Sequence, residues 1–162
     1  MKKLVVFVVC LLFVLSLAYA ADYVGSKKCK MCHKGAKKGE VWEKWEKGHH
    51  AKAFETLKTD ADKKNPECLA CHTTGFGKGG YKAGDANAAK FEGVGCESCH
   101  GPGSDYKKMS VMKDRKKAIE AGMVMPTEAL CKECHNKKSP DFKGFDFKEY
   151  MKKIDHTYRE KK

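Results

Sequence analysis

The sequence has no long apolar run after its first 20 residues and no cysteine outside five short stretches. Because a membrane-spanning helix needs about 20 consecutive apolar residues, the rest of the chain has no candidate for one. Acidic side chains are outnumbered by basic ones, which gives a formal net charge of +12, and there are only seven histidines. The glycine-rich stretch 73–84 lacks the Gly-Lys-Ser/Thr ending of a phosphate-binding loop.

Residues 1–20 have the pattern of a secretory signal peptide. Two lysines precede the apolar run Leu4 to Leu17, and Ala18-Tyr19-Ala20 is a cleavage signal of small residues. The run is shorter than a bilayer span, which disfavours a retained anchor. A lipoprotein would need a small residue before Cys10, where Val9 stands. We therefore expect Cys10 to be removed and residues 21–162 to form one exported, periplasmic domain.

The remaining eight cysteines form four copies of one unit, Cys-x-x-Cys-His. The units are Cys29, Cys32 and His33; Cys68, Cys71 and His72; Cys96, Cys99 and His100; and Cys131, Cys134 and His135. Two cysteines with this spacing can form thioether bonds to one haem, and the next histidine becomes the proximal iron ligand. A zinc site usually pairs two CxxC units, and a disulfide framework needs no histidine after each pair. The pattern predicts four covalently attached c-type haems.

Four haems in 142 mature residues determine the expected fold. So short a chain cannot build a core of protein alone and must wrap the cofactors. We expect a mainly α, haem-packed multihaem cytochrome with long loops and little β structure. The expected helices cover 38–58, from Asn65 into the second unit, 106–121, from Thr127 into the fourth unit, and 145–158. We expect the glycine-rich stretch 73–84 to pack against a haem.

The number of histidines limits the iron ligands. Four are proximal, which leaves His49, His50 and His156 for four irons. In a helix the neighbours His49 and His50 would point about 100° apart and could serve two haems, or one of them is exposed. At least one iron is then five-coordinate or takes methionine, tyrosine, water or a histidine of another molecule.

The excess of basic residues suggests an acidic partner. Loss of Lys2 and Lys3 with the leader lowers the net charge from +12 to +10, and haem propionates offset most of the rest. Export argues against nucleic acid as the partner. Lysines around an exposed haem edge would steer a redox protein with an acidic docking surface.

Several longer motifs make the chain resemble the tetrahaem cytochrome c-554 family. They are His50-Ala51-Lys52-Ala53; Gly75-Phe76-Gly77 and Gly79-Gly80-Tyr81 after Cys71-His72; Val94 to Gly103; and a terminal Phe-x-Phe helix with a histidine before Tyr158. The resemblance implies a periplasmic electron carrier with three bis-histidine haems and an open, five-coordinate haem at His72. It also implies that His50 is the distal ligand of the third haem and His156 that of the fourth.

The chain departs from the family at one ligand. The family has a histidine shortly after the third unit that binds the first haem, whereas residues 104–112 contain none here and Tyr106 lies in that region. His49 is the candidate replacement.

The expected function is electron transfer between a redox donor and an acceptor by hopping between haems. One alternative is nitric oxide or hydroxylamine reduction at an open haem, but the sequence shows no acid–base group for it. A second alternative is a subunit of a haem filament. The sequence leaves the oligomeric state open.

Overall fold

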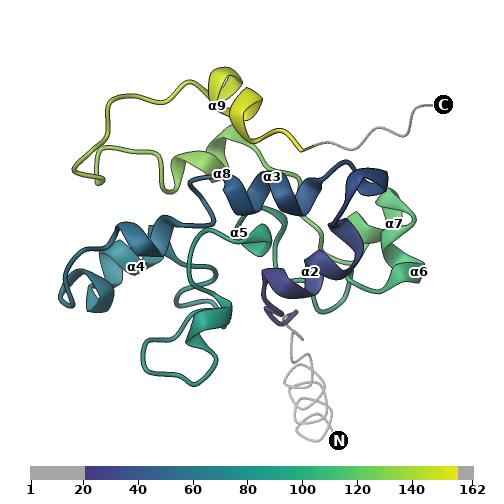
Figure 1. Cartoon of the computed structure of the whole chain (residues 1–162), viewed down its shortest axis with the longest axis horizontal. Helices are drawn as coiled ribbons and strands as arrows, with labels where there is room; N and C mark the ends of the chain where they lie inside the picture. Colours follow the sequence, from purple (N-terminus) through teal and green to yellow (C-terminus); the bar gives the residue numbers. More distant parts are fainter. Residues whose placement is uncertain (1–20, 157–162) are drawn as a thin grey trace, which may run out of the picture.

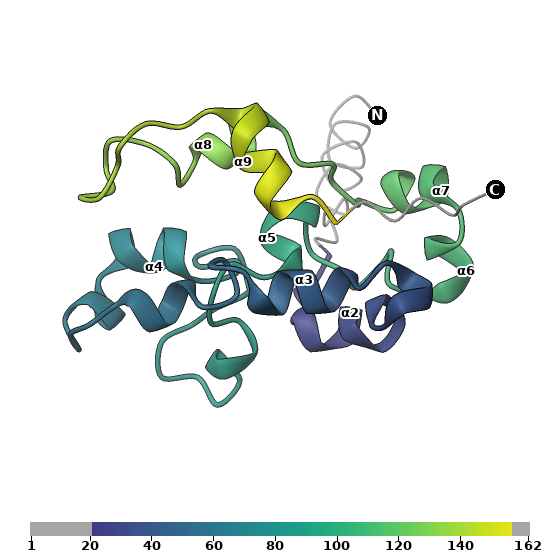
Figure 2. The same ribbon diagram turned by 45° about the horizontal axis from the view of Figure 1, so that its top comes forward.

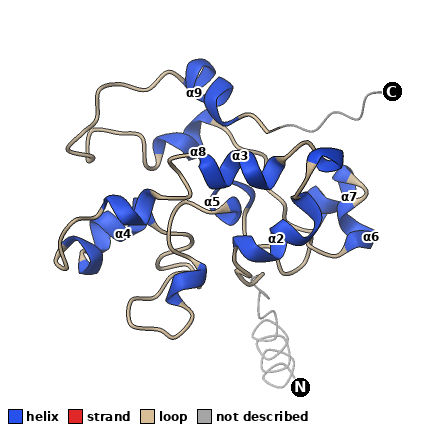
Figure 3. Cartoon of the chain, in the orientation of Figure 1, coloured by secondary structure: helices blue, strands red, loops and turns tan. Residues whose placement is uncertain are grey.

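Helices joined by long loops make up the computed structural model, which describes residues 21–156 (Figure 1). Within this range the β structure is one isolated antiparallel bridge between Thr73 and Glu92 (Figure 3). The expected mainly α class is confirmed. None of the helices in this range is long and apolar enough to cross a membrane. The predicted signal peptide, Cys10 and Tyr158 lie outside the described residues.

The elements are short. In chain order they are α2 (Ser26–His33), η1 (Ala36–Lys38), α3 (Val41–Lys47), η2 (Ala53–Thr56), η3 (Asp62–Lys64), α4 (Pro66–His72), η4 (Ala88–Lys90), α5 (Cys96–His100), α6 (Met109–Met112), α7 (Arg115–Glu120), α8 (Glu128–Lys132) and α9 (Phe147–Ile154), where η marks a 3-10 helix. In Figure 2, α8 and α9 lie above α5, and α2, α3 and α4 lie below it. The third cysteine unit, on α5, is thus central.

Side-chain caps begin four of these helices, α4, α7, α8 and α9. Asn65 accepts a hydrogen bond from the Glu67 N–H (2.9 Å) at the start of α4, and Thr127 accepts one from the Leu130 N–H (3.3 Å) before α8. Each such cap satisfies an N–H group that has no partner inside the helix. The predicted helix starts at Asn65 and Thr127 are therefore confirmed.

The predicted helix over 38–58 is wrong as one element. Helix α3 ends at Lys47, Gly48 is extended (φ −78°, ψ 162°), and η2 begins only at Ala53. The turn between them is fixed by the Val94 N–H, which donates to the His50 carbonyl at 2.8 Å. That tertiary hydrogen bond satisfies a carbonyl outside any helix. His49 and His50 therefore lie in a turn, and the argument from helical spacing does not apply to them.

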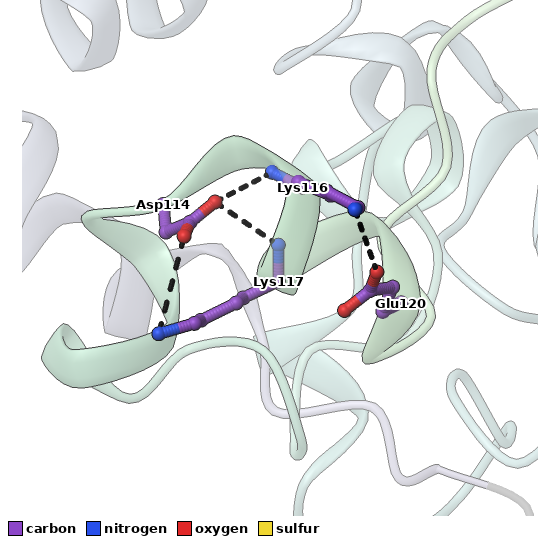
Figure 4. A network of polar contacts seen from close by, with 4 residues as sticks. All are labelled: Asp114, Lys116, Lys117 and Glu120. Carbon is purple, nitrogen blue, oxygen red and sulfur yellow. Dashed lines mark hydrogen bonds and ion pairs between the residues drawn. The ribbon is translucent and has the colours of Figure 1, made fainter.

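The predicted helix over 106–121 is also divided, into α6 and α7. Asp114 ends the first piece and caps the second, accepting hydrogen bonds from the Lys116 and Lys117 N–H groups at 2.9 and 3.2 Å (Figure 4). Lys116 pairs with Glu120 on the surface of α7. Aspartate competes for backbone donors and so favours a helix start over a helix interior.

The largest protein-only core lies beside the second cysteine unit. Leu57, Leu69 and Tyr81 are buried together, with Phe54 and Phe76 packed against them. Phe54 and Tyr81 have ring centroids 5.6 Å apart. The glycine-rich stretch places its aromatic side chains on this core, and its expected packing against a haem stays a prediction.

Leu69 is 1% exposed and sits inside the second unit, so this core and that site depend on one side chain. We expect Leu69→Ala to lower the free energy of unfolding by about 2–5 kcal/mol, because it leaves a cavity. Urea titration of the haem-loaded protein measures this. Ile119→Ala, at a side chain 45% exposed, is the control and should cost much less. Equal losses in the two variants would contradict the packing.

Candidate haem-binding site

Each cysteine unit begins on a short helix. The first three lie within α2, α4 and α5, and the fourth begins at the end of α8. In a helical turn residues i and i+3 share a face, so both thiols of a unit point the same way. In the fourth unit Cys134 and His135 follow the helix in a turn, where both N–H groups donate to the Cys131 carbonyl at 3.2 and 3.0 Å.

The thiols of different units touch one another. Cys29 of the first unit is hydrogen-bonded to Cys96 of the third, which raises the pKa of Cys29 and lowers the pKa of Cys96 to about 7. Burial, with smaller contributions from the charges of Cys131 and Cys96, raises the pKa of Cys99 to about 11. The first unit therefore lies beside the third, and the third lies near the fourth.

The second unit joins the same series through the fourth. Burial raises the pKa of Cys134 to about 12, and the charge and hydrogen bond of Cys71 contribute to the rise. The units therefore lie in the spatial order second, fourth, third, first, which differs from their order in the sequence.

Two proximal histidines are oriented by backbone carbonyl groups. His72 Nδ1 lies 2.7 Å from the Ala53 carbonyl oxygen, and His100 Nδ1 lies 3.0 Å from that of Val124. Because a carbonyl can only accept, Nδ1 carries the proton and Nε2 is free to bind a metal. The chain thus presents these imidazoles as metal ligands in the correct tautomer.

Two further histidines stand opposite proximal ones. The ring centroids of His50 and His135 are 6.0 Å apart, and those of His100 and His156 are 6.1 Å apart. This separation accommodates one metal atom between two ring nitrogens, each about 2 Å from it. His156 also donates Nδ1–H to the Ile154 carbonyl at 2.9 Å, which leaves Nε2 free.

These ring contacts differ from the pairing that the family resemblance implies. His50 was expected opposite the third proximal histidine and His156 opposite the fourth, but the structure exchanges them. His50, in the turn after α3, lies beside the fourth unit, and His156, beyond the end of α9, lies beside the third. Sequence order does not reveal such an exchange, because it depends on how the units are arranged in space.

His49 lies apart from these pairs. Its side chain is exposed, and in residues 21–156 the two other histidines whose rings contact a proximal histidine are His50 and His156. The charges that act on His33 come from His100, His156 and Lys38. The structure therefore gives the first unit no paired histidine in the described range.

Burial lowers the pKa of four of the imidazoles. It is the largest cause for His33, His50, His100 and His135, and the neighbouring imidazoles lower the pKa of the first three further. A lowered pKa favours the neutral ring, which is the form that binds a metal.

Residues 93–94 connect two of the sites through their backbone. The Gly93 N–H donates to the His72 carbonyl at 3.1 Å, and the Val94 N–H donates to that of His50. The Trp45 indole N–H donates to the Val94 carbonyl at 3.0 Å. Gly93 has φ +78°, and a Cβ there would lie 2.5 Å from the Ala51 carbonyl oxygen. Only glycine allows this close approach.

Glu97, inside the third unit, is a buried carboxylate that sequence reasoning missed. It is 1% exposed and accepts hydrogen bonds from the N–H groups of Val24, Gly25 and Gly103 at 2.7–2.8 Å. The carboxylate thereby joins the start of the domain to the loop that follows the third unit. In the sequence Glu97 is marked only by its place between Cys96 and Cys99, a position that many residue types can occupy.

Aromatic side chains fix the fourth proximal histidine. The Phe145 ring stacks on His135 with centroids 4.8 Å apart and planes 16° apart, and Tyr150 meets it edge-on at 5.4 Å. The sequence predicted one helix over 145–158 that would include both residues, but α9 begins only at Phe147. The sequence did not predict the contact of Phe145, which precedes α9.

The described residues fit haem better than the alternatives. All eight cysteines of residues 21–156 are free thiols, and no cluster of histidine, cysteine and acidic residues in that range could hold a metal ion alone. The Trp42 indole N–H is buried without a hydrogen-bond partner there. A buried donor of this kind is normally satisfied, and haem propionates would supply an acceptor.

Comparison with known proteins agrees with this site. The family described as cytochrome c554 and c-prime matches residues 28–101. Cytochrome c-554 of Nitrosomonas europaea is 33% identical over 157 residues, which cover 80% of this chain and 64% of that protein's length. The solved structure of reduced cytochrome c554 from the same organism has a TM-score of 0.57 at 29% identity, covering 86% of this chain and 80% of that one.

The mainly helical fold with repeated CxxCH units on short helices defines a multihaem c-type cytochrome, a protein that binds haem covalently. The chain is therefore similar to cytochromes c554 in sequence and in fold, and it spans 64% of the length of the curated relative that it matches.

Glu97 gives a testable result. In Glu97→Gln an amide NH₂ group replaces one acceptor oxygen and faces backbone donors, and a buried unsatisfied donor costs about 1–3 kcal/mol. We expect a loss of that size in the free energy of unfolding, measured by urea titration of the haem-loaded protein. Glu120→Gln, at an exposed ion pair, should change it by less than about 0.5 kcal/mol. Unchanged stability in Glu97→Gln would refute the role of this carboxylate.

Proposed function

We propose that this chain is an exported electron carrier that holds four haems, one at each CxxCH unit. The observation that carries the proposal is the proximity of the thiols in series: Cys71 is hydrogen-bonded to Cys134, Cys131 lies close enough to Cys99 for its charge to act on it, and Cys96 is hydrogen-bonded to Cys29. Because neighbouring attachment points lie close together, the haems bound to them would also lie close together, as electron transfer between haems requires. Each haem supplies a one-electron Fe(III)/Fe(II) couple when bound.

The protein residues have distinct roles in this function. The eight cysteines of residues 21–162 would attach the haems, and one iron each would be bound by His33, His72, His100 and His135. His50 and His156 would supply the second histidine at the fourth and third units. Two imidazoles on one iron close it to substrates, so these two sites suit electron transfer rather than catalysis.

Export is part of the proposal. Residues 1–20 direct the chain out of the cytoplasm and are then removed, so the mature protein begins at Ala21. The periplasm is an oxidising compartment, in which eight free thiols would be open to oxidation. Covalent attachment to haem would use those thiols.

Haem stoichiometry tests this proposal. The intact mass should equal that of residues 21–162 plus four haems, and the double change Cys131→Ala and Cys134→Ala should remove one haem. Mass spectrometry and a haemochrome assay measure both. The control is Cys10→Ala, which lies in the predicted leader and should leave the mature mass unchanged. Fewer than four haems in the wild-type protein would exclude the proposal.

The surface around the first unit favours an acidic redox partner. Exposed Lys27, Lys28, Lys34, Lys37 and Lys38 surround this unit, whereas Lys30 pairs with Glu46 at 3.9 Å. Cys32 is exposed and Met31 is 77% exposed. The first unit is also one end of the spatial series. Electrons can therefore enter or leave beside a positively charged surface, which speeds association with an acidic protein.

Charge reversal tests this surface. We expect the double variant Lys27→Glu and Lys28→Glu to lower the second-order rate of reduction by a photoreduced flavodoxin, an acidic redox protein, by about tenfold at low ionic strength. The effect should shrink in salt, because salt screens exposed charges. Stopped-flow absorbance measures the rate. The matched control reverses Lys63 and Lys64, beside the second unit. Equal slowing in both double variants would show that only net charge matters.

A further inference from the structure

The structure accounts for six of the seven histidines. Four follow the cysteine pairs, and two more stand 6.0 and 6.1 Å from His135 and His100. These two pairs serve the fourth and third units. The first and second units each have one histidine, and only His49 is left.

His49 is poorly placed to serve the first unit. Its side chain is exposed, and its backbone carbonyl accepts from the Lys52 N–H at 3.1 Å within the turn after α3. The next residue, His50, is fixed by the hydrogen bond from Val94 and by its ring contact with His135. Because His50 is held in place, the side chain of its neighbour His49 points in another direction and faces solvent.

Tyr106 is not a free ligand either. It is buried near Cys29 and Cys96, whose charges act on it, but its hydroxyl donates to the Gly101 carbonyl at 2.7 Å. An iron-bound tyrosine is a phenolate and cannot make that hydrogen bond as donor.

Several methionines are also directed elsewhere. Met31 and Met109 are 77% and 63% exposed. The Met125 sulfur accepts a hydrogen bond from the Arg115 guanidinium at 3.6 Å. These three side chains face solvent or another partner, so none of the three is in place as a ligand at the first unit.

We propose that the first haem, held by Cys29, Cys32 and His33, has no histidine as its second axial ligand and binds small exogenous ligands such as imidazole, cyanide or nitric oxide. The chain then carries two irons open to such ligands, one at the first unit and one at the second. This inference rests on the proposed function, because it requires haem at all four units.

The experiment counts high-spin ferric haems in the full-length, haem-loaded protein by electron paramagnetic resonance. We expect two per chain in the wild type, and a titration with imidazole should convert both to low spin. His49→Ala should leave the count at two. His50→Ala and His156→Ala should each raise it to three, because each opens a closed iron. These increases assign His50 to the fourth haem and His156 to the third. The two high-spin haems of the wild type are then the first and the second.

Three results would overturn the inference. One is a wild-type count of one high-spin haem, which would mean that a methionine or another residue fills the position. Another is a count that rises in His49→Ala. The third is a count that falls at high protein concentration only when His49 is present, since a second copy would then supply the ligand. Mass spectrometry on the same samples first establishes four haems, so a failure of the proposed function is recognised separately.

Discussion

The small amount of apolar side chain that the protein can bury by itself constrains its whole structure. In residues 21–156 the buried hydrophobic side chains are Trp42, Leu57, Leu69, Tyr81, Tyr106 and Ala118. A core of this size cannot offset the conformational entropy of so many ordered residues. The helices are short and the loops long because the elements are arranged around attachment points rather than around one another. Bound haem must supply the missing apolar interior.

The backbone around the third unit takes over part of the role of a core. Residues 93–94 bind the carbonyls of His72 and His50, and Glu97 binds the start of the domain and the loop after α5. These contacts link the second, third and fourth sites through hydrogen bonds of fixed geometry. Polar contacts of this kind specify one arrangement more sharply than apolar packing does. The central position of α5 in Figure 2 follows from them.

The structure also separates two kinds of cysteine unit by the histidines around them. At the third and fourth units the opposing histidine comes from a distant part of the chain and is held by its own hydrogen bond or turn. At the first and second units no opposing histidine is in place among the described residues. In the proposed function the paired units would suit electron transfer and the unpaired ones would be open to small molecules.

The sequence by itself determined the features that depend on local chemistry. The CxxCH spacing places two thiols and an imidazole on one helical turn, and Asn65 and Thr127 cap their helices wherever those helices lie. Only the tertiary structure decided which histidine faces which unit, where the long helices break, and that Glu97 is a buried anchor. Those outcomes depend on contacts between residues far apart in the chain, such as Val94 with His50 and His156 with His100. Periodicity cannot encode them, because it describes only one segment at a time.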